Sequence, residues 1–323
     1  MPDFLGIDTS NYTTSAAVFS TVTNSIRQSK KLLPVKKGEC GLRQSDAVFH
    51  HTNQLSDILK ELLLSTEKIE AVCVSTRPRN IDGSYMPCFL TGKTAAEIIT
   101  YTSKSELFYT SHQLGHIAAA LYSCGCMNLI DKEFIAFHVS GGTTDCLYCT
   151  PDREEIINAE QFSGSLDLKA GQAVDRVGVM LGLDFPCGIQ LEKLAENSHK
   201  HFKINIKLKG NDCCMSGLEN KCRKMYDDGE SKEDIARYCL EFIGQTIKAM
   251  TEKAIENYGK LPVVYAGGVM SNKYIRSFLE KSFDAYFAEP EFSCDNAAGV
   301  AIIAAEKYKR KINNADTFSF TDK

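Results

Sequence analysis

Phe134-Ile135-Ala136-Phe137-His138-Val139-Ser140-Gly141-Gly142-Thr143-Thr144-Asp145-Cys146-Leu147-Tyr148 has the pattern of an apolar strand, a turn of small residues and a second apolar strand. The same order occurs near the start of the chain. There, residues 4–10 and 14–19 flank a tight turn of Asn11, Tyr12 and Thr13. The repetition predicts two related lobes, each built around one such hairpin.

The turn of the later hairpin is a candidate phosphate site. Small residues in a turn let backbone N–H groups approach phosphate oxygens and form an anion-binding concavity. The candidate residues are Ser140, Gly141, Gly142 and Thr143.

Strand patterns alternate with helix patterns along the rest of the chain. Strands are predicted at residues 70–75 and 261–266, and helices at residues 91–102, 167–182 and 231–258. Ser231 is the predicted N-cap of the last of these helices. Such alternation predicts an α/β fold.

Length and composition limit the class of protein. The 323 residues are too many for one ordinary core and suit two lobes. Hydrophobic content of 43% and charged content of 24% are typical of a globular protein. The longest apolar runs fall well short of the roughly 20 residues that cross a bilayer, and the N-terminus lacks a basic start. We therefore expect no membrane partner and no signal peptide.

Cysteine usage and net charge bear on compartment and partners. Thirteen cysteines, an odd number scattered through strand and helix patterns, argue against a disulfide framework. We therefore expect a reducing, cytoplasmic location. The formal net charge of −4 gives no strong basic field, so RNA binding would need local patches or a partner.

Paired glycines follow the strand predicted at residues 261–266, in Gly267-Gly268-Val269-Met270-Ser271-Asn272. Bare backbone there would let the base or ribose of a nucleotide lie close. Crevices beyond the carboxyl ends of strands are where such sheets bind ligands. The alternative is a plain tight strand-to-helix turn, and we favour the ligand contact.

Two histidines form a candidate metal site in His112-Gln113-Leu114-Gly115-His116. Their spacing of four would place both imidazoles on one helix face, which suits a transition metal. Asp295 is a candidate third ligand. The alternatives are two surface histidines and an aspartate that caps the helix predicted after it.

A polar set within residues 165–175 is a second candidate nucleotide contact. Asp167, Gly171 and Asp175 are spaced by four and would share one face of the predicted helix. A glycine between two acids could let the carboxylates accept ribose hydroxyls. An ordinary amphipathic helix is the alternative.

These motifs, in this order, resemble the TsaD family, also called the glycoprotease or O-sialoglycoprotein endopeptidase family. The resemblance extends over nearly the whole chain. Protease activity is not expected despite this older name, because the sequence shows neither a nucleophile–base pair nor a metalloprotease glutamate. The matching segments are Leu5-Gly6-Ile7-Asp8-Thr9-Ser10, residues 76–84, 92–99, the histidine pair, residues 139–144, 167–176 and 180–183, Gly188, residues 191–194, Ser216-Gly217-Leu218, residues 266–272 and residues 295–298.

The resemblance implies a two-lobed actin-like ATPase fold, of the sugar kinase, Hsp70 and actin type, in which a ribonuclease H-like unit is duplicated around a central cleft. It implies an N-terminal lobe of residues 1–108, completed by a helix at about residues 297–311. A second lobe of residues 109–296 would hold the nucleotide and metal sites in the cleft.

The resemblance also implies the chemistry and its participants. A threonylcarbamoyl group would move from threonylcarbamoyl-AMP to N6 of the tRNA adenosine next to the anticodon. One divalent metal, iron or zinc, would be held at His112, His116 and Asp295. TsaB-like and TsaE-like proteins would be partners. The implied adenylate-binding residues are Asp167, Gly171, Asp175, Gly188, Gly267, Gly268 and Asn272, with the turn at residues 140–143.

The chain departs from the family pattern at several positions. Tyr12 and Thr13 stand where acidic residues are usual, and Thr143 stands where histidine is usual. Cys187 and Glu219 replace a usual glycine and lysine. Two alternatives therefore accompany the tRNA-modifying hypothesis: a carbamoyl-type transferase with another acceptor, and a non-catalytic nucleotide-binding scaffold.

Overall fold

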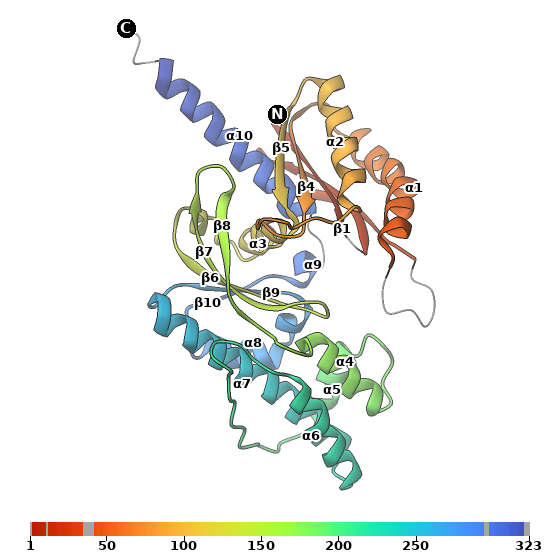
Figure 1. Cartoon of the computed structure of the whole chain (residues 1–323), viewed down its shortest axis with the longest axis vertical. Helices are drawn as coiled ribbons and strands as arrows, with labels where there is room; N and C mark the ends of the chain where they lie inside the picture. The colour runs from red at the N-terminus through yellow and green to blue at the C-terminus, as the bar shows by residue number, and fades with distance from the viewer. Residues whose placement is uncertain (1, 11, 35–41, 294–296, 320–323) are drawn as a thin grey trace. The chain divides into compact units, whose positions relative to one another are not determined.

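The computed structural model describes residues 2–10, 12–34, 42–293 and 297–319. The chain divides into two compact units: Met1–Ser123 with Pro151–Asn158 and Asp295–Lys323, and Cys124–Thr150 with Ala159–Cys294 (Figure 1). The expected lobe boundary after residue 108 falls within strand β5 (Glu106–Ser111), whereas the first unit continues through helix α3 (His112–Ser123).

The sheet of the first unit has five strands in the order β3-β2-β1-β4-β5. β1 pairs antiparallel with β2, which pairs antiparallel with β3, whereas β1, β4 and β5 are parallel. The expected hairpin at residues 4–19 is therefore confirmed, with Asn11 outside the described residues. The other strands are β1 (Asp3–Ser10), β2 (Thr13–Ser20), β3 (Ser25–Leu32) and β4 (Ile69–Arg77).

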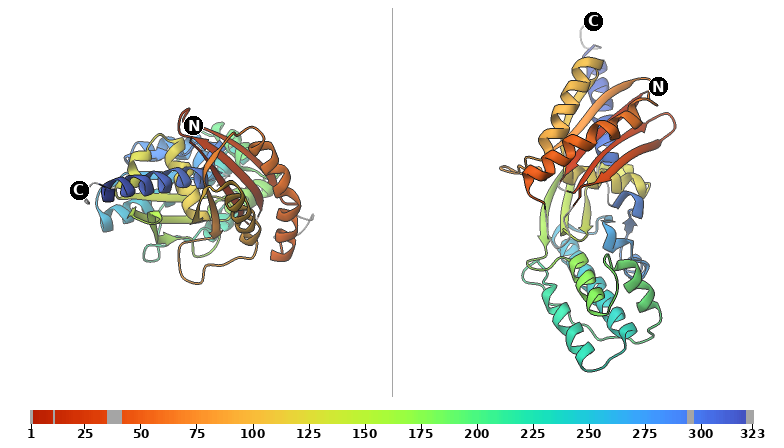
Figure 2. Two further views of the ribbon diagram at one scale, coloured as in Figure 1. Left: turned by 90° about the horizontal axis from the view of Figure 1, so that it is seen from above. Right: turned by 90° about the vertical axis from the view of Figure 1, so that its right-hand side faces the viewer.

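Helices cover both faces of this sheet. Gly6 of β1 lies under Ala297 and Ala301 of α10 (Ala297–Ser319), whereas the neighbouring Ile7 lies against Gly92 of α2 (Phe89–Ser103). Because successive strand residues point to opposite faces, α10 and α2 lie on opposite sides of β1 (Figure 2). Helix α1 (Gln44–Leu63) packs beside α2; α1 adds leucine and isoleucine side chains to the core, and α2 adds Ala96 and Ile99.

The sheet of the second unit repeats the first. Its order is β10-β9-β6-β7-β8, so β6 is central as β1 is, with an antiparallel partner on one side and a parallel partner on the other. The predicted internal repeat and the α/β class are confirmed by this shared strand order. The strands are β6 (Phe134–Val139), β7 (Thr144–Asp152), β8 (Ile156–Gly164), β9 (Val263–Ala266) and β10 (Ala285–Phe287).

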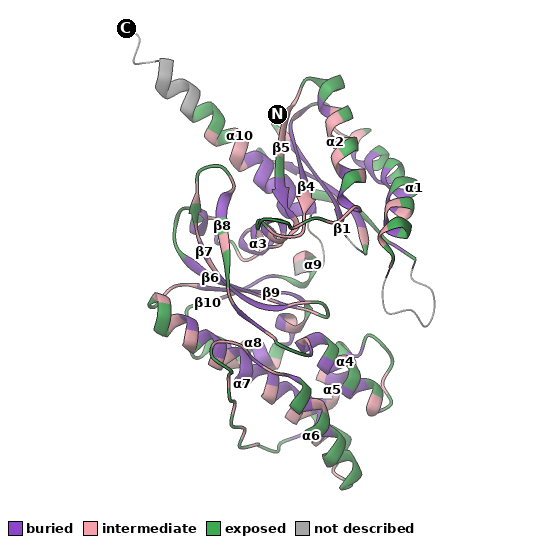
Figure 3. Ribbon diagram, in the orientation of Figure 1, coloured by how far each residue is buried: buried purple, intermediate pink, exposed green. Residues whose placement is uncertain are grey.

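A row of aromatic rings forms part of the core of the second unit. Phe137, Tyr265 and Phe287 lie opposite one another across β6, β9 and β10, with ring centroids 5.2 and 4.9 Å apart. The buried strands contrast with the exposed outer faces of the helices (Figure 3). The helices are α4 (Ala170–Met180), α5 (Gly188–Glu196), α6 (Ser216–Asp227), α7 (Lys232–Tyr258), α8 (Lys273–Glu280) and α9 (Pro290–Ser293), with 3-10 turns η1 (Met127–Asp131) and η2 (Gly268–Ser271).

The long helix α7 begins as its sequence predicts. The Ser231 side chain accepts a hydrogen bond from the backbone N–H of Asp234 and caps the helix. Among the described helices, none is both long enough and apolar enough to cross a bilayer.

Candidate functional site

Three polar side chains of the first unit meet at the carboxyl ends of adjacent parallel strands. Asp8 lies near the end of β1, Ser75 near the end of β4, and His112 directly after β5. Ser75 Oγ donates a hydrogen bond to Asp8 Oδ1, and His112 Nδ1 lies 3.2 Å from both Asp8 oxygens. This strand edge is where open α/β sheets place ligands.

The Asp8 carboxylate is almost completely buried, with 1% of its surface exposed. Burial raises the pKa of Asp8. The charge and hydrogen bond of His112, with the hydrogen bonds of Ser75 and Ser10, together lower this pKa by more, so it lies below its ordinary value. Ser75 and His112 therefore supply the polar partners that a buried carboxylate needs.

The predicted histidine pair is on one helix face. His112 and His116 begin α3, with ring centroids 4.8 Å apart and planes at 72°. Both side chains are half-buried. Two imidazoles one turn apart fit the nitrogen ligands of a transition metal. The expected third ligand, Asp295, lies outside the described residues, and the described part of the chain forms no complete cluster of three metal-ligating side chains.

A cavity of about 500 Å³ in the second unit gathers many of the predicted nucleotide contacts. Apolar side chains of Val174, Leu240, Val269 and Ile275 form part of its wall. The predicted residues that line it are Gly141, Gly171, Asp175, Gly188, Gly268 and Asn272. Ligand sites commonly combine apolar walls with a few such polar groups.

Gly171 allows the start of α4 to approach the phosphate-type turn. Its backbone N–H donates to the Ser140 carbonyl oxygen at 3.1 Å, and a Cβ atom at Gly171 would stand 2.6 Å from the Gly141 nitrogen. No real Cβ makes such a contact without movement of the backbone, so glycine is required here.

The turn itself is closed by internal hydrogen bonds. Ser140 N–H donates to the Thr143 carbonyl oxygen at 2.8 Å. The backbone N–H groups of Gly142 and Thr143 donate to Ser140 Oγ, at 3.3 and 3.2 Å. A phosphate oxygen would therefore have to replace Ser140 Oγ as the acceptor of these two groups.

Asp175 is held on the cavity wall by the residue that replaces a usual glycine. Its Oδ1 accepts a hydrogen bond from the Cys187 backbone N–H at 2.9 Å, while the Cys187 side chain packs on Gly178. Another departure, Glu219, pairs with Arg176 at 3.0 Å. Both unusual residues have a local structural partner.

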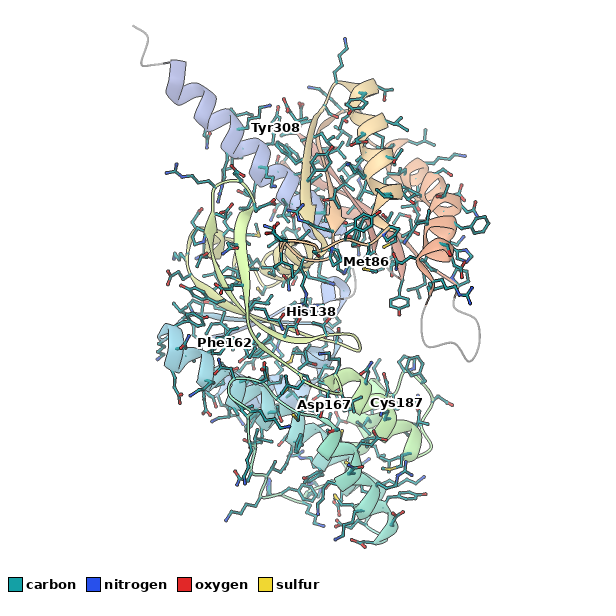
Figure 4. All side chains as sticks on the ribbon, viewed as in Figure 1. Met86, His138, Phe162, Asp167, Cys187 and Tyr308 are labelled. Atoms are coloured by element: carbon teal, nitrogen blue, oxygen red, sulfur yellow. The ribbon has the colours of Figure 1, made fainter. Side chains whose placement is uncertain are left out.

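The predicted placement of Asp167 on the helix face was wrong. Helix α4 begins only at Ala170, so Gly171 and Asp175 share one of its faces. Asp167, which is labelled in Figure 4, precedes the helix. The Asp167 carboxylate instead accepts hydrogen bonds from the backbone of Leu168 and Met215 and from Ser216. Burial raises the pKa of Asp167, but these hydrogen bonds bring it below its ordinary value. Asp167 is close to α4 in sequence, and nothing in the sequence indicates that this carboxylate binds the start of α6 instead.

Gly267 has a backbone role. Its φ is +99°, and a Cβ atom there would lie 2.3 Å from the Val139 carbonyl oxygen. Gly268 and Asn272 line the cavity, and Asn272 Oδ1 also caps α8 through the Ile275 N–H at 3.0 Å.

Asp8 and the apolar cavity residues were not among the predicted site residues. An acid inside the apolar run Phe4-Leu5-Gly6-Ile7-Asp8 is itself a signal, because carboxylates are rarely buried without partners. Leu240 and Ile275 carried no such signal, since they are indistinguishable in sequence from ordinary core residues.

Comparison with known proteins gives a family match over most of the chain. The family model described as "TsaD: tRNA N6-adenosine threonylcarbamoyltransferase" matches residues 24–302. A tRNA N6-adenosine threonylcarbamoyltransferase of Thermococcus sibiricus is 27% identical over 291 residues, which are 87% of this chain and 84% of that protein.

Other relatives are longer. A probable bifunctional tRNA threonylcarbamoyladenosine biosynthesis protein of Methanococcus maripaludis is 27% identical over 275 residues, 83% of this chain and 48% of the relative. The chain thus spans about half the length of the first curated relatives it matches.

Solved structures identify the fold. Full-length HypF in a phosphate- and nucleotide-bound form has a TM-score of 0.60 at 14% identity, covering 93% of this chain and 46% of HypF. Component A of (R)-2-hydroxyglutaryl-CoA dehydratase from Acidaminococcus fermentans has a TM-score of 0.57 at 16% identity, covering 95% of this chain and 99% of that one. The predicted actin-like ATPase fold is confirmed.

Proposed function

Because this chain belongs to the TsaD family of tRNA N6-adenosine threonylcarbamoyltransferases, we propose that it moves a threonylcarbamoyl group from threonylcarbamoyl-AMP to N6 of the tRNA adenosine next to the anticodon, with release of AMP. The observation that supports this most directly is the cavity of the second unit, where Gly141, Gly171, Asp175 and Gly268 gather. Family membership favours a tRNA acceptor over another acceptor or a non-catalytic scaffold.

The cavity suits the adenosine part of the donor. Val269, Leu240 and Ile275 offer an apolar wall to the base. The Asp175 carboxylate has one oxygen held by Cys187 N–H, and its other oxygen would accept a ribose hydroxyl. The bare backbone of Gly268 would let the ribose lie close.

The phosphate would lie at the turn of residues 140–143. The backbone N–H groups of Gly142 and Thr143 would donate to its oxygens in place of Ser140 Oγ. These donors would stabilise the negative charge that grows on the phosphate as AMP leaves. The acceptor adenine would lose a proton from N6 as its bond to the carbamoyl carbon forms.

The metal would be held by His112, His116 and Asp295. The spacing and separation of the two imidazoles support this assignment. A bound divalent ion, iron or zinc, would act as a Lewis acid and template for phosphate and carbamoyl oxygens.

Partner subunits of the TsaB-like and TsaE-like kind would assist, in the cytoplasm where tRNA is available. An apolar groove between α1 and α2 supports the presence of a partner. It is lined by Val48, Leu55, Leu59, Leu90, Ala95 and Ile98, among others. Leu90 and Ile98 are exposed, which is uncommon for neighbouring large apolar side chains unless a surface is covered.

The test is a modification assay. Purified chain, tRNA, threonylcarbamoyl-AMP and the partner proteins are incubated, and the tRNA nucleosides are analysed by mass spectrometry. We expect threonylcarbamoyladenosine in the complete mixture and its absence when the chain is omitted. No product from a folded chain with partners supplied would overturn the proposal.

A further inference from the structure

A polar contact that the sequence did not predict joins Asp8 of β1 to His112 at the start of α3. His112 Nδ1 lies 3.2 Å from each oxygen of Asp8, so one ring nitrogen is shared between both oxygens of a single carboxylate. Asp8 is 1% exposed, whereas the His112 side chain is 28% exposed. The carboxylate therefore reaches His112 from the protein interior.

The direction of this hydrogen bond follows from the chemistry of the partners. Carboxylate oxygens are hydrogen-bond acceptors, and Ser75 Oγ already donates to Asp8 Oδ1. One ring nitrogen placed 3.2 Å from both oxygens of Asp8 has the geometry of an Nδ1–H donor. A neutral imidazole protonated at Nδ1 has its lone pair on Nε2.

Strand geometry fixes the Asp8 carboxylate before any ligand arrives. β1, β4 and β5 are adjacent and parallel, so Asp8, Ser75 and His112 come from three neighbouring strand ends. Asp8 thus has a rigid support on the sheet, and α3 begins at the residue that it contacts.

We propose that Asp8 is a positioning residue that holds the Nδ1–H of His112 and so directs Nε2 of that ring to the metal. The inference rests on the metal site of the proposed function. A carboxylate behind a metal-binding histidine fixes the tautomer and ring orientation and raises the basicity of the ligating nitrogen. Asp8 touches neither the metal nor the substrate in this role.

Zinc affinity of the full chain is the first test, measured by competition with a chromophoric chelator. Asp8→Asn keeps the shape of the side chain but removes its charge, and we expect zinc affinity to fall about 10- to 100-fold. His112→Ala should lose more, because it removes the ligand itself. Glu241→Gln is the matched control, since it makes the same change at another buried carboxylate, in the second unit, and should bind zinc as the wild type does.

A second measurement does not depend on whether Asp8→Asn folds. NMR of nitrogen-labelled histidine in the metal-free wild type, at slightly alkaline pH, reports which ring nitrogen carries the proton. His112, assigned by comparison with His112→Ala, should be protonated at Nδ1. Protonation at Nε2 would overturn the inference, as would protonation at both nitrogens, which indicates a purely structural ion pair.

The outcomes separate the two proposals. Wild-type chain that binds zinc, together with Asp8→Asn that binds equally tightly, would overturn the role of Asp8 and leave the metal site standing. Wild-type chain that fails to bind zinc, cobalt or ferrous iron would overturn both. The cobalt absorption spectrum adds a check: an unchanged ligand field in Asp8→Asn agrees with a residue behind the ligand, whereas a changed coordination number would make Asp8 a ligand and overturn its positioning role.

Discussion

Gly171 of α4 and Gly141 of the hairpin turn approach so closely that a Cβ atom on Gly171 would lie 2.6 Å from the Gly141 nitrogen. The start of α4 and the turn that is proposed to bind phosphate are therefore packed as one body. Any side chain at position 171 must push the turn away.

Gly171→Ala should accordingly impair nucleotide binding. The added methyl group would force the backbone apart at a cost of about 1–3 kcal/mol, more than the helix propensity of alanine offsets. We expect a lower melting temperature and weaker binding of AMP by calorimetry. Gly217→Ala in α6, where a Cβ meets nothing within 4 Å, is the control and should lower neither the melting temperature nor AMP binding. Normal AMP binding by Gly171→Ala would contradict the assigned site.

Asp175→Asn should weaken AMP binding while the fold is kept. The asparagine oxygen can still accept from Cys187 N–H, but the charged acceptor for the ribose is lost. We expect the Kd for AMP to rise about tenfold. A Kd equal to that of the wild type would remove Asp175 from the site.

Asp167→Ala, unlike Asp175→Asn, should lower stability more than AMP binding. Its carboxylate holds Met215 and Ser216 at the start of α6 and does not line the cavity, so the main loss should be in stability, about 1–2 kcal/mol. Denaturant unfolding and AMP titration together decide this. A large loss of AMP affinity at unchanged stability would instead support the predicted direct contact of Asp167 with the nucleotide.

His51 makes stability depend on pH. This side chain is fully buried beside Thr14, and burial lowers its pKa from 6.5 to about 4. Because the unfolded chain binds the proton more readily, this contribution is complete above about pH 6.5 and is lost as pH falls towards 4. At pH 5 we expect a loss of about 2 kcal/mol relative to pH 7.5.

His51→Gln tests that prediction, since it cannot titrate. The unfolding free energy of the variant should change less between the two pH values than that of the wild type. Equal changes in both proteins would show that other groups cause the pH dependence.

Much of the fold could be predicted because its signals lie between residues that are close in the sequence. The two hairpins have apolar runs on both sides of small turn residues, and Ser231 carries the cap signal of α7. The boundary of α4 could not be predicted, because its helical periodicity continues back to Asp167 and only the α6 backbone, 48 residues away, draws that carboxylate out of the helix.

The candidate site divides in the same way. His112 and His116 were found by a spacing of four within one helix, and Gly171 and Asp175 by the same spacing. Asp8 was missed because its partners, Ser75 and His112, are 67 and 104 residues distant.

The sequence by itself determined the repeated hairpin, the α/β class and most candidate ligands, since periodicity, turn residues and caps act between residues that are near in the chain. Only the tertiary structure decided which polar groups share a pocket and which hold the backbone together. Asp8 contacts a histidine 104 residues away and Asp175 contacts the backbone of Cys187, 12 residues away, and both contacts depend on how strands and helices pack.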